Sequence, residues 1–222
     1  MNLTEALHVR HSVRQYKNKP IDAETVSALQ AEIERCNQES GLHIQLVTNE
    51  PKAFDGFMAH YGKFRGVTNY IAMIGKKGAD LDEKCGYYGE RLVLRAQQLG
   101  LNTCWVALTY TKIKTAFSVR KGEKLCIVIS IGYGETQGTA HRSKPFEKVV
   151  KAEGQVPDWV KDGVNAALLA PTAMNQQKFQ FTIHDDQVSV KAGTGFYTKI
   201  DLGIVKYHFE IGANKPDFTW SI

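Results

Sequence analysis

The chain has 222 residues, 43% of them hydrophobic, which suffices for a sizeable core and argues against a mainly disordered protein. Its formal net charge is +5, with basic residues dispersed rather than gathered into the stripe typical of nucleic-acid surfaces. No apolar run approaches the roughly 20 residues that cross a bilayer, and the start lacks the apolar segment of a secretory signal. We therefore expect a cytoplasmic protein that binds small anionic ligands, without nucleic-acid or membrane partners.

The four cysteines lie at positions 36, 85, 104 and 126, with neither a CxxC pair nor the Cys/His spacing of a metal site. Their helical or apolar surroundings are typical of reduced thiols buried in a core. The sequence therefore predicts no bound metal.

Helix and strand patterns alternate along the first part of the chain. The expected helices cover residues 4–10, then from the cap at Asp22 to the stop at Gly41, then 51–62 and 82–99. The expected strands cover residues 42–48, 69–75, 103–108 and 125–132. Residues 148–156 look like a charged connector to a second part.

The second part has fewer elements. We expect helices over 158–170 and 199–213, a hairpin formed by 178–184 and 187–192, and a terminal strand over 217–222. The order predicts an α+β fold, with a mixed sheet and helices packed around it, as a single unit of two halves, about 1–150 and 151–222.

A weak internal duplication relates the two halves. Helix, polar turn and short strand follow one another over 31–47 and again over 165–183, and the spacing from Gly89 to Trp105 resembles that from Gly203 to Trp220. Chance and ordinary α+β architecture explain this likeness as well as ancestry does.

Arg10, His11, Ser12 and Arg14 lie within five positions near the start of the chain. Two guanidinium groups and a hydroxyl can converge on a phosphate dianion, so the pattern favours a phosphate clamp. A solvated basic turn, with Ser12 as a cap, is the alternative interpretation.

A second cluster is APTAMNQQKF, residues 170–179. Thr172 can cap a helical turn and leave the N–H groups of Ala173 and Met174 facing outward, where they suit the carbonyl edge of a flavin. Asn175 and Gln176 add amide donors and acceptors nearby. An ordinary connector between elements is equally compatible with these residues.

The third cluster, GYGETQGTAHRSKP, superficially resembles a dinucleotide-binding loop. Its glycines, Gly132, Gly134 and Gly138, are spaced one residue too widely, and no amphipathic helix follows them. Arg142 and Lys144 could complete a phosphate site, or belong to an exposed basic loop. No HExxH, GxSxG or GxxxxGK[ST] signature occurs anywhere in the chain.

Together these motifs resemble the nitroreductase superfamily, and within it the shorter branch labelled the TM type. The matching segments are Arg10-x-Ser12-x-Arg14-x-Tyr16, GERLVLRAQQLGLNTCW, ISIGYGE with Arg142 and Lys144 downstream, and APTAMNQQKF. The resemblance implies an FMN-dependent, nitroreductase-like enzyme that carries electrons from NADH or NADPH to a nitroaromatic, a quinone or a similar acceptor by a ping-pong mechanism. The flavin, rather than a catalytic side chain, would carry the chemistry.

The resemblance also assigns roles to residues. Arg10, Ser12 and Arg14 would bind the FMN phosphate, assisted by Arg142 or Lys144. The isoalloxazine would lie along Pro171, Thr172, Ala173 and Asn175, near the segment that ends at Trp105. Lys63 and Arg65 are weaker candidates for the pyrimidine edge of the flavin.

This chain departs from the family pattern in one respect. The amide-rich motif usually follows the first long helix, whereas here it lies in the second half, with Lys178 and Phe179 where Pro and Trp are usual. Typical members are homodimers that assemble the flavin site from two subunits. We therefore expect a fused pseudo-dimer that binds one FMN per chain as a monomer, with a further homodimer as the alternative.

Two other functions compete with this hypothesis. A flavin carrier or sensor would present the same binding groups without turnover. A dehydrogenase that uses only a nicotinamide cofactor would rely on the GYGETQG loop and show no flavin affinity.

Overall fold

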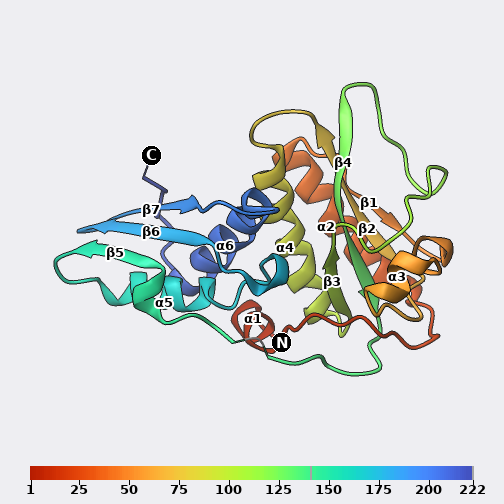
Figure 1. Cartoon of the computed structure of the whole chain (residues 1–222), viewed down its shortest axis with the longest axis horizontal. Helices are drawn as coiled ribbons and strands as arrows, with labels where there is room; N and C mark the ends of the chain where they lie inside the picture. Colours follow the sequence, from red (N-terminus) through yellow and green to blue (C-terminus); the bar gives the residue numbers. More distant parts are fainter. Residues whose placement is uncertain (141, 222) are drawn as a thin grey trace.

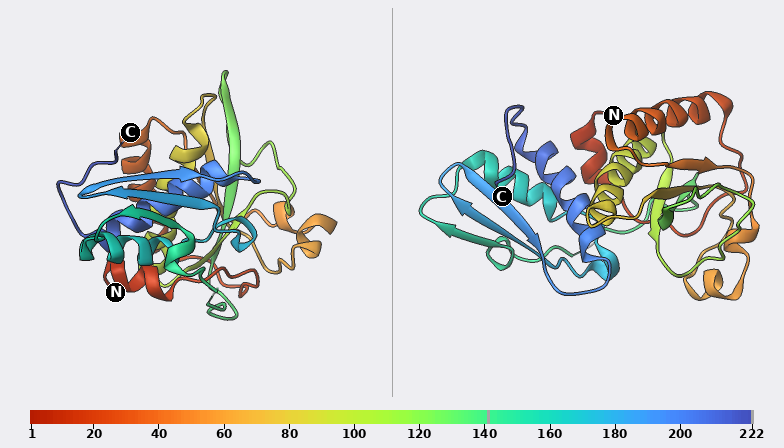
Figure 2. Two further views of the ribbon diagram at one scale, coloured as in Figure 1. Left: turned by 60° about the vertical axis from the view of Figure 1, so that its left-hand side comes forward. Right: turned by 90° about the horizontal axis from the view of Figure 1, so that it is seen from above.

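A computed structural model describes residues 1–140 and 142–221 of the chain. Two helices, α4 (Leu81–Gln98) and α6 (Thr198–Ala213), pack against each other in the middle of the molecule (Figure 1). One sheet lies on each side of this pair, as the views from other directions confirm (Figure 2). The α+β class predicted from the sequence is confirmed, with the strands divided between two sheets.

The first sheet is antiparallel, in the order β1-β2-β4-β3. Its strands are β1 (Gln45–Val47), β2 (Tyr70–Lys76), β3 (Asn102–Val106) and β4 (Glu123–Gly132). Strand β2 is buried up to Gly75 and β4 is buried from Ile127 onward, because α4 and α2 (Ala23–Ser40) pack on one face and the aromatic cluster of Phe54, Phe64 and Phe117 covers the other.

The N-terminal segment begins with α1 (Leu3–Val9), where Asn2 and Glu5 form a capping box. After Arg10 the chain is extended and lies along the edge of the first sheet: Val13 N–H donates to Thr103 O at 2.9 Å. At its far end, Tyr16 N–H donates to Arg65 O at 2.9 Å, so backbone hydrogen bonds hold this segment at both Val13 and Tyr16.

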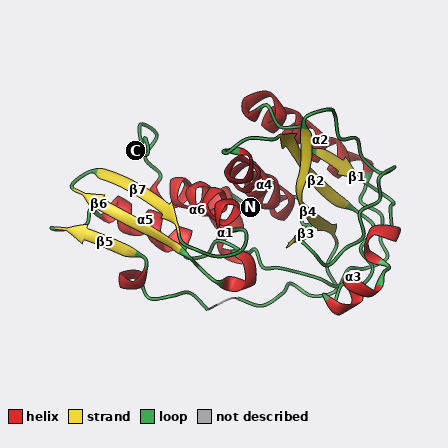
Figure 3. Ribbon diagram, turned by 45° about the horizontal axis from the view of Figure 1, so that its top comes forward, coloured by secondary structure: helices red, strands yellow, loops and turns green. Residues whose placement is uncertain are grey.

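The second sheet has the order β5-β6-β7, with β5 and β6 parallel and β6 and β7 antiparallel. Its strands are β5 (Val150–Glu153), β6 (Phe179–His184) and β7 (Gln187–Ala192). The helices α5 (Asp158–Ala167) and α6 pack beside it, and Figure 3 shows α1, α4 and α6 between the two sheets.

The two halves share an element order and meet through matching glycines. The series α2, β1, β2, α4 has a counterpart in α5, β6, β7, α6. A Cβ on Gly86 would collide with the carbonyl of Ile200, and a Cβ on Gly203 would collide with the carbonyl of Glu83. Gly86 therefore faces the residue three positions before Gly203, and Gly203 faces the residue three positions before Gly86. Such a reciprocal pair of contacts is typical of an interface with two-fold symmetry. Gly86, rather than Gly89, is the counterpart of Gly203.

Three sequence-based expectations about elements are wrong. Residues 51–62 form a 3₁₀ helix, η1 (Lys52–Phe54), and a separate α3 (Phe57–Tyr61), with Gly56 between them. The connector contains β5, and a 3₁₀ helix, η2 (Phe146–Lys148), precedes it.

The third wrong expectation is the strand predicted for the terminal segment. Residues 217–221 form no strand: Phe218 and Trp220 pack on Phe209 of α6, and Ser221 N–H donates to Val188 O of β7 at 3.0 Å; Ile222 lies outside the described residues. Within the described part of the chain, none of the helices has the length and apolar character needed to span a membrane.

Candidate functional site

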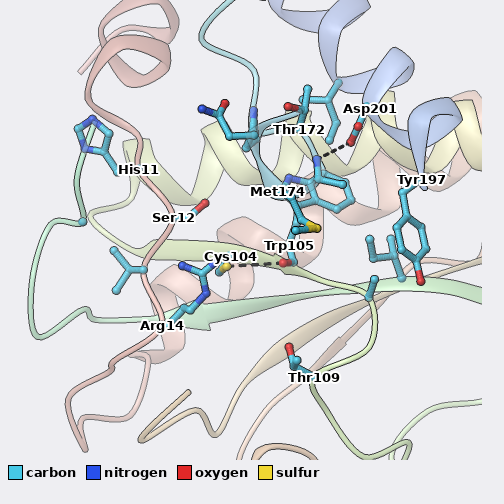
Figure 4. Close-up of a pocket in the computed structure, with 18 of the residues that line it drawn as sticks. His11, Ser12, Arg14, Cys104, Trp105, Thr109, Thr172, Met174, Tyr197 and Asp201 are labelled. Carbon is cyan, nitrogen blue, oxygen red and sulfur yellow. Dashed lines mark hydrogen bonds between the residues drawn. The ribbon is translucent and has the colours of Figure 1, made fainter. Parts of the chain in front are cut away.

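A cavity of about 1070 Å³ lies between the extended N-terminal segment and the bend that follows α5 (Figure 4). Twelve of the residues predicted from the sequence line it: Arg10, His11, Ser12, Arg14, Lys63, Trp105, Pro171, Thr172, Ala173, Met174, Asn175 and Gln176. The first and second sequence clusters therefore meet at one site, although about 160 positions of chain separate them. The cavity is at the upper end of the range for ligand pockets.

One wall of the cavity is built by residues 10–15. In an extended chain alternate side chains share a face, so Arg10, Ser12 and Arg14 lie on the same side while Val13 is buried in the core. Arg14 is exposed, and its guanidinium carbon lies 5.9 Å from the Phe64 ring centre. Lys63, at a left-handed φ of 62°, adds a further exposed cation.

Arg10 differs from the other cations because only 4% of its surface is exposed. Its Nε atom is buried without a hydrogen-bond partner in the described chain, and the nearest carboxylate oxygen, Glu90 Oε1, is 3.7 Å away. Burial lowers the pKa of Arg10, and the charge of Glu90 opposes that effect. A buried guanidinium with unused donors is costly unless an anion satisfies it, so this residue fits a phosphate ligand.

The opposite wall is a strained bend that contains the 3₁₀ helix η3 (Ala173–Asn175). Met174, Asn175 and Gln177 have left-handed φ values of 51°, 53° and 45°. Each non-glycine residue in this conformation costs about 1–2 kcal/mol. Strain of this kind concentrates at functional sites, where surrounding contacts hold it in place.

Contacts within the protein occupy most of the donors of this bend. Ala173 N–H donates to Asp201 Oδ1 at 2.9 Å, so the expectation that this N–H faces outward is wrong. The amide nitrogen of Gln176 donates to Asp201 Oδ2 at 2.7 Å and to Phe196 O at 2.8 Å. Thr172 caps no helix: its hydroxyl accepts from Gln177 N–H at 3.0 Å.

The amide of Asn175 is also engaged. It donates to Arg142 O at 3.0 Å and accepts from the side chain of Gln177 at 2.8 Å. Met174 N–H and Gln176 Oε1 have no hydrogen-bond partner in the described chain. These two groups are therefore free to meet a ligand.

Asp201 is a polar residue of this site that the sequence analysis missed. It is only 3% exposed, and it anchors the bend from the first turn of α6. Burial raises the pKa of Asp201 to about 6, opposed by the hydrogen bonds from Ala173 and Gln176. A lone acid on the apolar face of the predicted helix 199–213 was the signal available in the sequence.

Arg65, Arg142 and Lys144 do not line the cavity. Lys144 Nζ donates to Gln177 O at 2.9 Å, and Lys144 N–H donates to Gln177 Oε1 at 2.8 Å, so this residue supports the bend from behind. Arg142 contributes its carbonyl to the same support.

Arg65 Nη2 donates to Gln15 Oε1 at 3.2 Å and lies 3.7 Å from the carboxylate of Glu135. The structure therefore offers no support for placing Arg65, Arg142 or Lys144 on the ligand.

The floor of the cavity includes Cys104 and Trp105 of β3. The Trp105 indole donates to Glu90 Oε2 at 2.9 Å, and its ring lies directly over Gly89, where a Cβ would collide with it. Burial raises the pKa of the Cys104 thiol. In the described residues no cluster of three or more His, Cys, Asp or Glu side chains could hold a metal.

Large exposed hydrophobic side chains border the cavity. They are Tyr61, Leu108, Met174 and Phe196, with exposed fractions of 75%, 68%, 98% and 81%. Only Met174 was predicted from the sequence, since isolated apolar residues in loops carry no recognisable pattern. The site thus combines cations on one wall with an apolar rim, as suits a ligand with an anionic tail and a flat head.

Comparison with known proteins places this geometry in a family. A family model described as "Putative TM nitroreductase" matches residues 2–213. None of the curated proteins matches the chain. A "putative nitroreductase" from Thermotoga maritima is similar in structure, with a TM-score of 0.63 and 21% identity over 96% of this chain and 83% of that one.

Two further structures are similar over a smaller part of the chain. A Desulfovibrio desulfuricans protein in complex with FMN has a TM-score of 0.55 and 18% identity over 71% of this chain and 99% of its own. A Clostridium difficile FMN-dependent nitroreductase has a TM-score of 0.51 and 18% identity over 65% of this chain and 95% of its own. Such low identities establish the fold alone, but the family model spans nearly every residue. The chain therefore belongs to the TM nitroreductase family.

Proposed function

We propose that this protein is an FMN-dependent oxidoreductase that takes electrons from NADH or NADPH and passes them to a nitroaromatic, a quinone or a similar small acceptor. The observation that carries the proposal is the buried guanidinium of Arg10, which has a donor without a hydrogen-bond partner and lines a cavity shared with an amide-bearing bend. Family membership makes a flavin the natural ligand, and two neighbours are described as FMN-bound or FMN-dependent.

The residues on the cationic wall would hold the phosphate. Arg10 would supply a guanidinium whose position is restricted by burial. Ser12 and the exposed Arg14 would add a hydroxyl and a second guanidinium. His11 borders the same wall, with Nδ1 3.3 Å from Gln137 O.

The bend would hold the flat head of the cofactor. Met174 N–H is a free donor and Gln176 Oε1 a free acceptor, and a flavin edge carries both carbonyl oxygens and an N–H. Lys63 provides a cation that can stabilise negative charge on a reduced ring. When bound, FMN supplies the hydride and electron chemistry itself.

The apolar rim would exclude water and receive the second molecule. Phe196 and Leu108 expose large apolar surfaces at the cavity, which suits stacking against a nicotinamide or an aromatic acceptor. The cavity is large enough for a flavin and one further flat molecule, so donor and acceptor would bind in turn, as a ping-pong cycle requires.

We also propose that one chain binds one FMN as a self-sufficient monomer. Both walls of the cavity come from the same chain, and the repeated element order with its reciprocal glycine contact resembles two subunits joined. Native mass spectrometry should show a monomer with a single FMN. Two FMN per chain, or a flavin held only by a dimer, would contradict this arrangement.

The test of the function begins with the visible spectrum of the freshly purified protein, which should show two flavin bands. Anaerobic mixing with NADH or NADPH should then bleach the bound flavin, and a quinone or nitroaromatic should restore the colour. A yellow protein that neither nucleotide bleaches would be a flavin carrier instead. A colourless protein without affinity for added FMN would reject the proposal and favour a nicotinamide-only enzyme.

A further inference from the structure

Behind the cationic wall, buried polar groups from distant parts of the chain converge on the carboxylate of Glu90. Glu90, on α4, has no exposed surface. Its Oε1 lies 2.8 Å from His208 Nε2 and 3.7 Å from Arg10 Nε, and its Oε2 accepts from the Trp105 indole. Arg10 and Trp105 line the cavity, whereas Glu90 and His208 do not.

His208 connects this cluster to the other half of the molecule. It lies on α6 with no exposed surface, and its Nδ1 is 3.1 Å from the carbonyl oxygen of Ala166 in α5. A carbonyl oxygen accepts only, so Nδ1 carries a proton. Nε2 faces Glu90, which can be a carboxylate or a carboxylic acid.

The neighbours of Glu90 decide between these two states. The Trp105 indole N–H donates to one oxygen, and the Arg10 guanidinium lies beside the other. Both groups stabilise the ionised form of the carboxyl group. Beside a Glu90 carboxylate, His208 faces two acceptors, and an imidazolium would satisfy both of them with its two N–H groups.

We propose that His208 is a positioning residue for the phosphate site, acting through Glu90: its positive charge neutralises the Glu90 carboxylate and thereby leaves the charge of Arg10 available to a phosphate in the cavity. Two cations and one anion give the cluster a net charge of +1. Without the His208 charge, Arg10 and Glu90 would cancel each other, and an incoming phosphate would meet a neutral pair.

This inference rests on the proposed function, because it assigns the cavity a flavin with a phosphate tail. It adds that the second half of the chain supports both ends of the ligand. The bend holds the head, and α6 sets the charge that binds the tail.

The experiment compares FMN with riboflavin, which lacks the phosphate. Dissociation constants from flavin fluorescence would be measured for the parent protein, His208→Gln, Glu90→Gln and the double variant. Glutamine keeps an N–H donor toward Glu90 but no charge, so His208→Gln should lower the preference for FMN about ten-fold, the loss expected for one charge-assisted bond. Removing the carboxylate as well should restore the preference.

The double variant separates charge from structure, because a purely structural role for His208 would not be rescued by a second substitution in the core. Thermal unfolding of each variant reports whether it folds. His184→Gln is the matched control, since His184 is an exposed imidazole 3.5 Å from the carboxylate of Glu153, far from the phosphate site, and it should change nothing.

A further readout needs no flavin. In the parent protein the ¹⁵N shifts of both His208 ring nitrogens should lie in the imidazolium range at pH 7.5. A neutral tautomer there, an unchanged FMN preference in folded His208→Gln, or no recovery in the double variant would overturn the inference. Failure of the parent protein to bind any flavin would refute the proposed function instead.

Discussion

The two walls of the cavity hold their polar groups in opposite ways. On the cationic wall, Arg10 keeps a buried nitrogen without a partner, and Arg14 and Lys63 are exposed. On the bend, Ala173 N–H and the amides of Asn175 and Gln176 are already hydrogen-bonded within the protein. The polar groups of the cationic wall therefore have few hydrogen-bond partners within the protein, whereas most of those on the bend are already hydrogen-bonded.

This difference implies that substitutions on the two walls should change different properties, ligand affinity on one and protein stability on the other. A residue on the cationic wall should affect ligand affinity first, because its side chain makes few polar contacts in the free protein, the 3.7 Å contact of Arg10 with Glu90 being the exception. A residue that holds the bend should affect stability and its pH dependence first, because its interactions exist in the free protein. The following substitutions test that division.

The largest effect is expected on the cationic wall. Arg10→Ala should weaken FMN binding by about 3 to 4 kcal/mol, because it removes a desolvated charge-assisted bond and leaves the Glu90 carboxylate near the phosphate. Arg14→Ala, at an exposed position, should cost about 1 kcal/mol. Isothermal titration with FMN and with riboflavin would measure both losses, which should be confined to FMN.

Arg65→Ala is the matched control for this pair, since Arg65 is an exposed arginine beside the same segment and does not line the cavity. It should leave FMN affinity unchanged. Equal losses for Arg10→Ala and Arg65→Ala would remove the distinction between a ligand-binding arginine and a surface arginine.

The bend should respond to pH through Asp201. The pKa of this carboxyl is about 6 in the folded protein, against an ordinary value of 3.8. Between pH 4 and 6 the folded protein therefore holds a proton that the unfolded chain has lost, so stability falls as the pH rises through this window. Asp201→Asn cannot titrate, so the parent protein should lose about 2 to 3 kcal/mol relative to the variant by pH 7.

Urea unfolding of both proteins at a series of pH values would measure this difference. A constant difference in unfolding free energy from pH 4 to pH 7 would show that Asp201 titrates normally and that its burial has little energetic consequence. Lys144→Ala, which removes a hydrogen bond to Gln177 at the same bend without removing an acid, should show no such pH dependence.

The cationic wall was accessible to sequence analysis because its chemistry is local. Arg10, Ser12 and Arg14 occupy alternate positions of one extended segment, so their spacing alone predicts a shared face. The bend was only half predictable: Pro171 marks the end of the helix, but the partner of Ala173 N–H is Asp201, 28 positions further along. Contacts of that separation depend on how helices pack, which composition and periodicity do not encode.

The strands show the same limit. Strands β2 and β4 were predicted because long apolar runs must be buried, whatever their partners. The terminal segment has the alternation of a strand, yet its aromatic side chains pack on Phe209 of α6, a contact between distant residues that the alternation does not predict. The sequence could not separate two roles for Arg142 and Lys144, since a residue near a site can support its backbone as well as its ligand, and the structure shows Lys144 Nζ and the Arg142 carbonyl in the first role.

The smallest effect is expected where the bend stores strain without making contacts. Met174 has a left-handed φ of 51° and is 98% exposed, so its side chain contributes almost no packing. Met174→Gly should relieve about 1–2 kcal/mol of backbone strain and lose about 0.5–1 kcal/mol through the greater freedom of glycine in the unfolded chain. A net stabilisation of about 0 to 1.5 kcal/mol should follow, measured as a small rise in Tm. Val119→Gly, at another exposed apolar side chain without a left-handed φ, should instead destabilise.

If Met174→Gly also lowers Tm, the strain at this wall is held by side-chain contacts rather than by Asp201, and the contrast between the two walls weakens.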